Sequence, residues 1–340
     1  MIASNSRNQG TRYVLIAILT TLILSFGCHS KGNEIIQRQQ LSQRLIELEQ
    51  HQGWHILVHR MDDISYLCQS ERKLEAIYSR FSKPIKGWIG FGSISADGKK
   101  LSLATEPYEQ RSATLTVFDI ESGKEERILT MPYLFGPRWS LDGKRIAFAS
   151  RSGSRGNFDL NVYDIATSDV SPLLAGELPS GEGYFDWSPD GQRIIYENAA
   201  GDVAIIDLQT KKKRTLGKGG SPRWSPDGKL ICYHKDGEDA LVLRDVETDQ
   251  SRMILKGKRA SSPAWSPDGR YLSYSRPYSG ISKQIKDLSM LVDTRGDLWA
   301  MDTASEVEVK LFTAEESIYP TYWGPIVRRP LSASSTLTQK

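Results

Sequence analysis

Between residues 54 and 326 the chain is a succession of short apolar runs separated by polar turns. The runs are rich in Val, Ile, Leu, Tyr and Phe, and many alternate apolar with polar positions. Short runs of this kind predict β-strands, because alternate side chains of a strand face opposite sides of its sheet. The pattern predicts an all-β domain over most of the chain.

One phrase recurs in phase with this pattern. Trp-Ser-Pro-Asp-Gly, or a close variant, ends at Gly143, Gly191, Gly228 and Gly269, and an earlier form, Ile-Ser-Ala-Asp-Gly, ends at Gly98. The glycines are 45, 48, 37 and 41 residues apart. A period of this size is typical of a propeller blade.

The phrase also predicts how the strands are arranged within each repeat. Asp-Gly between two apolar runs predicts a hairpin turn, since glycine accepts a positive φ at no steric cost. A second phrase, an apolar run ending in aspartate, follows in each repeat and predicts a third strand, and a shorter fourth strand comes after it. The aspartates are Asp119, Asp164, Asp207, Asp245 and Asp302. Four strands per repeat define a blade.

The two ends of the repeat region are complementary. Residues 54–78 hold three strand-like runs with no first strand, whereas Tyr319–Trp323 resembles a first strand with nothing after it. Joining them completes one more blade and removes exposed sheet edges. We therefore predict an all-β, six-bladed β-propeller closed by a blade shared between the N- and C-terminal strands, with seven blades as the alternative.

A leader and a helix precede this region. Residues 1–12 carry two arginines and no acid, residues 13–27 are apolar, and Cys28 follows. An apolar run of this length favours an export signal over a spanning helix. We expect residues 1–28 to be a signal peptide or lipoprotein leader with lipidation at Cys28, the alternatives being plain cleavage and an uncleaved anchor. Residues 29–53 predict a helical linker capped at Asn33, and 327–340 a disordered tail.

The repeats resemble those of the TolB-type PD40 family, whose blade phrase is Trp-Ser-Pro-Asp-Gly followed by a Tyr-Val-Met-Asp-like strand. The resemblance covers about residues 54–326 and implies the propeller fold. The founding member of that family is a periplasmic binding protein with an α/β domain before the propeller. In this sequence only residues 29–53 lie between the leader and the predicted propeller, so we do not expect the protein to be an orthologue of that founding member.

Loop lengths suggest where a binding site would lie. Asp-Gly turns fall on one face of the predicted ring, whereas longer segments (105–113, 151–158, 173–185 and the insertion 277–296) fall on the other. Long loops on a rigid scaffold commonly carry binding sites. We expect binding residues near the entries of the innermost strands on this loop face. The candidates are Tyr133, Arg138, Tyr184, Asp186, Arg223 and Tyr319.

Composition narrows the chemistry. A net charge of +3 with one dense basic cluster, Lys211–Arg214, argues against nucleic-acid binding. The sequence has no Gly-x-Ser-x-Gly, His-Glu-x-x-His or Cys-x-x-Cys motif. His51, His55 and His59 have helical spacing, which on a helix could gather a metal ion. Residues 54–58 resemble a strand, however, and on a strand His55 and His59 would lie far apart. We therefore expect no metal and no cofactor. Cys68 and Cys232 lie in apolar runs and are interpreted as buried thiols rather than a disulfide.

These observations predict a monomeric, non-catalytic binding or scaffold protein of the cell envelope. It would be periplasmic or extracellular, tethered to a membrane through Cys28, and would contact a protein or a cell-wall component. Two alternatives remain: a carbohydrate- or peptide-active enzyme with a site in the channel, and a sensory propeller held by an uncleaved leader.

Overall fold

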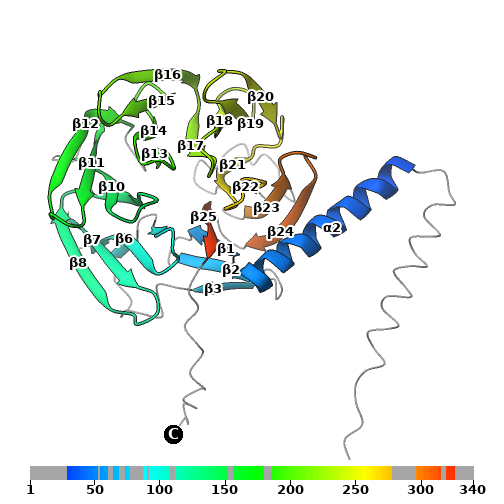
Figure 1. Cartoon of the computed structure of the whole chain (residues 1–340), viewed down its shortest axis with the longest axis horizontal. Coiled ribbons are helices and arrows are strands. Elements are labelled where there is room, and N and C mark those ends of the chain that lie inside the picture. Colours follow the sequence, from blue (N-terminus) through cyan, green and yellow to red (C-terminus); the bar gives the residue numbers. More distant parts are fainter. Residues whose placement is uncertain are drawn as a thin grey trace, which may run out of the picture.

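A computed structural model describes residues 29–52, 54–59, 64–68, 73–76, 87–89, 92–107, 112–151, 156–179, 185–277, 296–314 and 319–325. Cys28, Tyr184 and most of the insertion 277–296 lie outside the described residues. Apart from one helix, α2 (His29–Gln52), the elements of the described part are β-strands. They form antiparallel sheets arranged as a ring around a central channel (Figure 1).

Five of these sheets are blades of four strands. In four of them neighbouring strands follow one another along the chain. One runs from β13 (Phe185–Trp187) through β14 (Arg193–Glu197) and β15 (Asp202–Asp207) to β16 (Lys213–Lys218). The next runs from β17 (Gly220–Trp224) through β18 (Leu230–Lys235) and β19 (Ala240–Asp245) to β20 (Ser251–Ile254). A third runs from β21 (Ser261–Trp265) through β22 (Tyr271–Pro277) and β23 (Gly296–Asp302) to β24 (Glu308–Ala314). A fourth contains β9 (Phe135–Trp139), β10 (Arg145–Ser150), β11 (Phe158–Asp164) and β12 (Val170–Leu178).

The fifth four-stranded blade joins the two ends of the repeat region. The C-terminal strand β25 (Tyr319–Pro325) pairs with β1 (Trp54–His59), which is followed by β2 (Ile64–Cys68) and β3 (Lys73–Ala76). The register sets His55 opposite Gly324 and Leu57 opposite Tyr322. The predicted closure between the N- and C-terminal strands is therefore confirmed.

The prediction of a six-bladed propeller is wrong, because the described part has five four-stranded blades. The remaining sheet has five strands: β4 (Gly87–Ile89), β5 (Ser93–Ile94), β6 (Lys100–Pro107), β7 (Ala113–Asp119) and β8 (Glu125–Met131). Both β4 and β5 pair with β6, so two short strands stand where the blades have one inner strand. This is the repeat in which Ile94 replaces the tryptophan of the recurring phrase.

The recurring Asp-Gly forms the expected turn. Gly98, Gly143, Gly191, Gly228 and Gly269 all have φ between 66° and 73°. In each turn the glycine N–H donates to the carbonyl of the serine three residues earlier, at 2.8–2.9 Å. A side chain with a Cβ is strained at such φ values, which explains the recurrence of glycine.

The hydrophobic core consists of clusters between neighbouring sheets. One cluster joins Leu160 of β11 to Phe185 and Tyr196 of the next blade, all at most 1% exposed. Equivalent clusters lie between three further pairs of neighbouring sheets in the described part. The sheets of these pairs thus bury facing surfaces against each other, as in other propellers.

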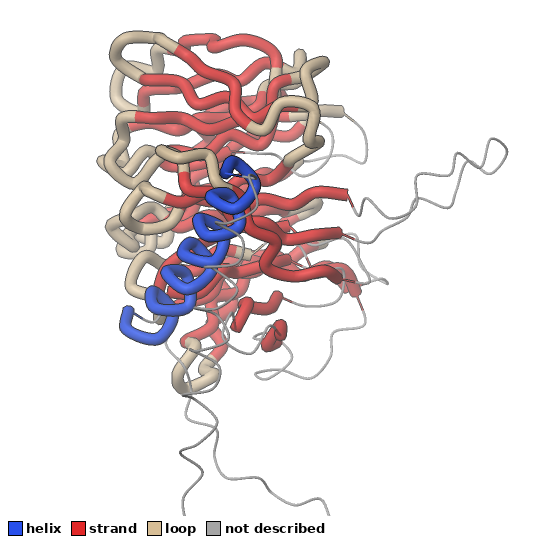
Figure 2. Tube along the Cα trace, turned by 90° about the vertical axis from the view of Figure 1, so that its right-hand side faces the viewer, coloured by secondary structure: helices blue, strands red, loops and turns tan. Residues whose placement is uncertain are grey.

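Helix α2 lies across the outer side of the ring (Figure 2). Leu41, Leu45 and Leu48, spaced four and three residues apart, are buried and form one cluster with Ile56 of β1 and residues of β23 and β24. Burying a leucine contributes about 1.5–3 kcal/mol, so this stripe is enough to dock the helix. The helix begins at His29, so Asn33 lies inside it and is exposed, and the predicted cap is wrong. No helix of the described part is long and apolar enough to cross a membrane.

Candidate functional site

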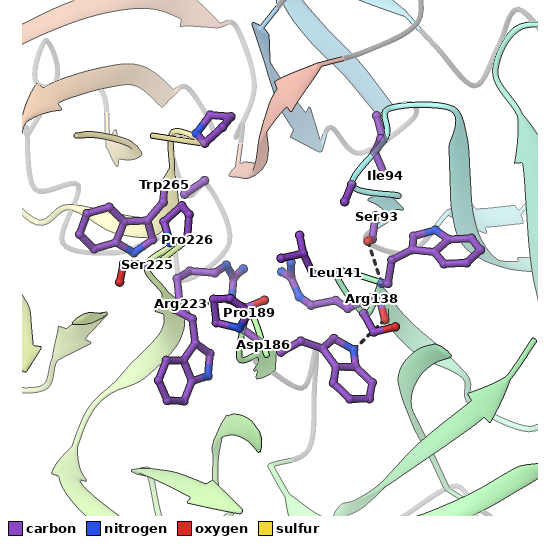
Figure 3. A pocket seen from close by; sticks show the side chains of 17 residues that line it. Ser93, Ile94, Arg138, Leu141, Asp186, Pro189, Arg223, Ser225, Pro226 and Trp265 are labelled. Atoms are coloured by element: carbon purple, nitrogen blue, oxygen red, sulfur yellow. Dashed lines mark hydrogen bonds between the residues drawn. The ribbon is translucent and has the colours of Figure 1, made fainter. Parts of the chain in front are cut away.

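A cavity of about 400 Å3 lies at one end of the central channel (Figure 3). Its wall is built from the same few positions of the repeat: the residue before the tryptophan, the tryptophan, and the residues of the following turn. The members are Ser93, Ile94, Ala96, Arg138, Trp139, Ser140, Leu141, Asp186, Trp187, Pro189, Arg223, Trp224, Ser225, Pro226, Ala264, Trp265 and Pro267. We call this space the channel cavity.

Three of the predicted binding residues meet there. Arg138, Asp186 and Arg223 each precede the tryptophan of their repeat, and this position lines the channel in β9, β13 and β17. Figure 3 shows both arginine side chains extending toward the middle of the cavity from different inner strands. The periodic position, rather than proximity in sequence, brings these three charged groups together.

The location of these residues differs from the expectation. We predicted them at the strand entries on the loop face, but the channel cavity also includes the Asp-Gly turn residues Leu141, Pro189 and Pro226. The inner strands are short and end at the tryptophan, so the residue directly before the tryptophan lies close to the turn that follows. The cavity therefore belongs to the tight-turn face.

The other three candidates are not among the lining residues. Tyr133 stacks on Arg151, with the guanidinium carbon 4.5 Å from the ring centre, and Arg151 also lies 4.6 Å from the Phe158 ring. Tyr319 lies in β25, of which only the backbone is described, and Tyr184 lies outside the described residues. Their role in binding stays a prediction.

Hydrogen bonds between neighbouring repeats fix the wall. The hydroxyl of Ser93 accepts from the backbone N–H of Trp139 at 3.1 Å, and the Asp186 carboxylate accepts from that of Trp224 at 3.0 Å. The two acceptors occupy the same repeat position, one in the five-stranded sheet and one in a regular blade. Each of these hydrogen bonds links one inner strand to the next, so contacts between neighbouring sheets fix the shape of the cavity wall.

The tryptophans form the apolar part of the wall. Trp139, Trp187, Trp224 and Trp265 are each at most 7% exposed. The guanidinium of Arg145 lies 4.8 Å from the centre of the Trp187 ring, and Arg193 is placed in the same way over Trp224. Such cation–π contacts, made from one blade to the next, restrain the orientation of the indoles.

The turns after the tryptophans form the rim of the cavity. Pro189, Pro226 and Pro267 occupy the third position of the phrase, and Ala96 and Leu141 occupy it in the two repeats that lack proline. The Leu141 side chain is 54% exposed, which is unusual for a leucine beside an aromatic wall. Sequence reasoning missed these rim residues and the indoles, although the recurring phrase was the signal that would have found them.

The cavity holds few groups suited to proton transfer or nucleophilic attack. Cys232 pairs with Arg223 across β17 and β18, and it is buried and free. Burial raises the pKa of this thiol, and nearby Arg223 only partly opposes that shift. The prediction of a buried thiol is confirmed for Cys232. Among the described residues, no three His, Cys, Asp or Glu side chains gather as a metal site.

A closed ring of antiparallel sheets around a channel is a β-propeller, here with a cavity at the tight-turn face. The sequence matches the TolB beta propeller domain family (PD40) over residues 91–327. This match covers more than half of the chain, so the chain belongs to that family. The resemblance noted from the recurring phrase is confirmed. No curated protein sequence matches the chain significantly.

Two solved structures share the fold. TolB from Acinetobacter baumannii is 19% identical with a TM-score of 0.63, covering 80% of this chain and 66% of that one. A chain of a nidogen/laminin complex is 12% identical with a TM-score of 0.59, covering 80% and 98%. An oligogalacturonate lyase in complex with manganese is more distant, with a TM-score of 0.48, 13% identity and coverage of 65% and 70%. This chain therefore spans about two thirds of the length of that TolB.

Proposed function

We propose that this protein is a non-catalytic binding or scaffold protein of the cell envelope, and that it contacts a protein or cell-wall partner at the channel cavity. The observation that supports this most is the position of Arg138, Asp186 and Arg223, which converge on one cavity rimmed by apolar turn residues. A concave, mostly apolar site with a few convergent polar groups is the usual form of a binding site.

The rigidity of the wall favours binding. The inner strands are linked from repeat to repeat by Ser93 and Asp186, and each rim residue sits in a hydrogen-bonded turn. A preformed site loses little conformational entropy when a partner binds, so more of the contact energy contributes to affinity. The propeller thus suits a scaffold that presents a fixed surface.

The channel-site enzyme remains the alternative. General acid–base catalysis needs a group positioned to transfer a proton at the working pH, and glycoside hydrolysis commonly uses two carboxylates. Asp186 is the carboxylate among the residues that line the cavity, and it already accepts a hydrogen bond from Trp224. These observations support binding over catalysis as the proposed role.

Photo-crosslinking from the cavity rim tests the proposed role. A photoreactive phenylalanine at Leu141, which lines the cavity and is 54% exposed, should give a discrete adduct with an envelope component. The same residue at Met253, which is 42% exposed on the outer strand β20, serves as the control. The adduct at Leu141 should disappear when Arg138 and Arg223 are both replaced by Gln. Equal labelling from both positions, or an adduct insensitive to the arginines, would reject the cavity as the contact site.

We further propose that Cys28 anchors the protein to a membrane, which the leader pattern of the sequence supports. The full chain expressed in a bacterium should incorporate a labelled fatty acid and fractionate with membranes. Cys28→Ser should lose the label and keep its leader. Absence of label from both chains, with the wild type soluble after cleavage, would contradict anchoring and leave the cavity proposal untouched.

A further inference from the structure

Helix α2 begins directly after the residue that we propose as the membrane anchor. Cys28 is followed in the sequence by His29, which is the first residue of α2. The helix has 24 residues. It therefore spans about 36 Å, because an α-helix rises by roughly 1.5 Å per residue. A lipid on Cys28 would be joined to this helix without a flexible linker in between.

The second half of the helix is fixed to the ring. Leu41, Leu45 and Leu48 are buried in one cluster with Ile56 of β1 and with residues of β23 and β24. The helix also lines a cavity of about 350 Å3 together with turn residues of the blade β21–β24, and this contact begins at Gln37. From Gln37 onward, the helix is therefore attached to the propeller along its length.

The part of the helix before this contact is exposed and mostly polar. Of residues 33–36, three are exposed and Ile36 is half-buried. Glu34 forms an ion pair of 2.6 Å with Arg38 one turn later, and pairs with this spacing stabilise an exposed helix. A helix that lies in a lipid interface has a broad apolar face, whereas here the exposed Ile35 is flanked by polar side chains. This part of α2 therefore suits a spacer that stands in water.

The helix points sideways from the propeller. Figure 1, in which the ring surrounds the channel, shows the N-terminal end of α2 beyond the outer strand β24 and directed away from the ring. Figure 2 shows the helix across the outer side of the ring, over neither end of the channel. An anchor at this end of the helix would lie beside the ring and not above or below the channel.

We propose that α2 is a rigid spacer that holds the propeller edge-on to a lipid surface, with the channel axis along the membrane and the blade β21–β24 on the membrane side. Both ends of the channel then face solution, so the channel cavity is open to a partner. This inference rests on the proposed anchoring at Cys28 and adds how the anchored propeller is oriented.

Energy transfer from the propeller to lipid tests the orientation. The full chain, expressed in a bacterium and carrying its lipid, is reconstituted in vesicles of phosphatidylethanolamine and phosphatidylglycerol with a dye on the lipid headgroup. A fluorescent amino acid replaces either Ala304 or Ala166.

The two probe positions are matched. Both alanines are exposed, and they follow Asp302 and Asp164 at the same position of the turn between the third and fourth strands of their blades. The two blades lie on opposite sides of the ring (Figure 1). Transfer from position 304 should exceed transfer from position 166, because the turn between β23 and β24 lies on the side toward which the N-terminal end of α2 points.

A break in the exposed part of the helix tests the role of α2. Ile35→Gly combined with Ile36→Pro introduces a flexible residue and removes a backbone donor before the docked part. The difference in transfer between the two probe positions should then be lost. Ile35→Ala combined with Ile36→Ala is the matched control and should retain the difference, because alanine favours the helix. The thermal unfolding midpoint, followed by circular dichroism, should be the same for both pairs, since neither position belongs to the buried leucine stripe.

The outcomes separate this inference from the anchoring on which it rests. Vesicle-bound wild type with equal transfer from both positions would overturn the edge-on orientation and leave the anchor in place. A difference that survives the helix-breaking pair of substitutions would overturn the role of α2 as the spacer. Absence of the fatty-acid label, with no protein on the vesicles, would reject the anchor and the orientation together.

Discussion

The hydroxyl of Ser140 joins both ends of its hairpin turn. It donates to the Asp142 carboxylate at 2.6 Å and accepts the backbone N–H of Arg145 at 3.0 Å, and the residue is fully buried. The same carboxylate accepts the backbone N–H of Lys144 at 3.0 Å. Serine and aspartate recur in the phrase because one small hydroxyl and one carboxylate satisfy the polar groups that the turn buries beside the cavity.

Protonation would weaken this arrangement. Burial alone would raise the pKa of Asp142, but the hydrogen bonds from Ser140 and Lys144 outweigh it and lower the pKa below its ordinary value. The pKa values of Asp97, Asp190 and Asp227 are lowered in the same way. A lowered pKa in the folded state contributes stability above the unfolded pKa of about 4, and this contribution is lost as the pH falls through the folded value.

Ser140→Ala should therefore lower the free energy of unfolding by about 1–3 kcal/mol at neutral pH, because it leaves buried polar groups without their partner. The deficit relative to the wild type should shrink below about pH 4, where protonation of Asp142 weakens the same bond. Urea unfolding across this pH range measures both effects. Ser251→Ala, at an exposed site on β20, should change stability by less than about 0.5 kcal/mol. A deficit that is equally large at acid pH would show that the carboxylate does not share in the effect.

At the scale of elements, the sequence predicted the strands that carry a strong local signal. The turn glycines and the three N-terminal strands β1, β2 and β3 lie where the pattern placed them. Residues 173–185 were expected to be a long loop, yet β12 extends to Leu178 and pairs with β11 up to Phe158. Pro172 and Gly176 are ordinarily loop-forming residues, and pairing with the neighbouring strand overrides that preference.

The helix shows a similar limit. The sequence predicted the helix but did not decide where it lies, and the structure docks it on the edge of the propeller through Leu41, Leu45 and Leu48. The start was misplaced because Asn33 is a favourable cap only where the helix begins, and the four residues before it are also helical. The capping preference of one residue is a weak indicator of where a helix begins when the residues on both sides can also be helical.

At the scale of the whole molecule, the candidate site was only partly predictable. Arg138, Asp186 and Arg223 could be found because they share one position of the repeat. The face of the propeller on which they lie could not be predicted, because it depends on the length of the inner strands. The split of the inner strand into β4 and β5 was equally hidden, because the sequence marks that repeat only by Ile94 in place of tryptophan. The position of a residue within the repeat can be read from the sequence, whereas its position along the channel can be seen only in the folded structure.

Closure of the ring yields the last prediction, because the propeller depends on strand β25. Six residues of β25 pair with β1, the first strand of the chain, so contacts at the two ends of the repeat region hold one blade together. A chain that ends at residue 318 would leave β1 with an unpaired edge that can join other chains. We expect it to lose several kcal/mol of stability and to aggregate as its concentration rises, since each lost hydrogen bond contributes roughly 1 kcal/mol.

The matched control is a chain that ends at Pro325, which keeps β25 whole. Its urea unfolding midpoint should equal that of the full chain, and light scattering should show no growth with concentration. The shorter chain should unfold at a lower midpoint with a smaller slope, because part of the ring is already open before unfolding. Identical midpoints for both truncations would mean that the remaining sheets hold the ring without β25, and closure would then not stabilise the propeller.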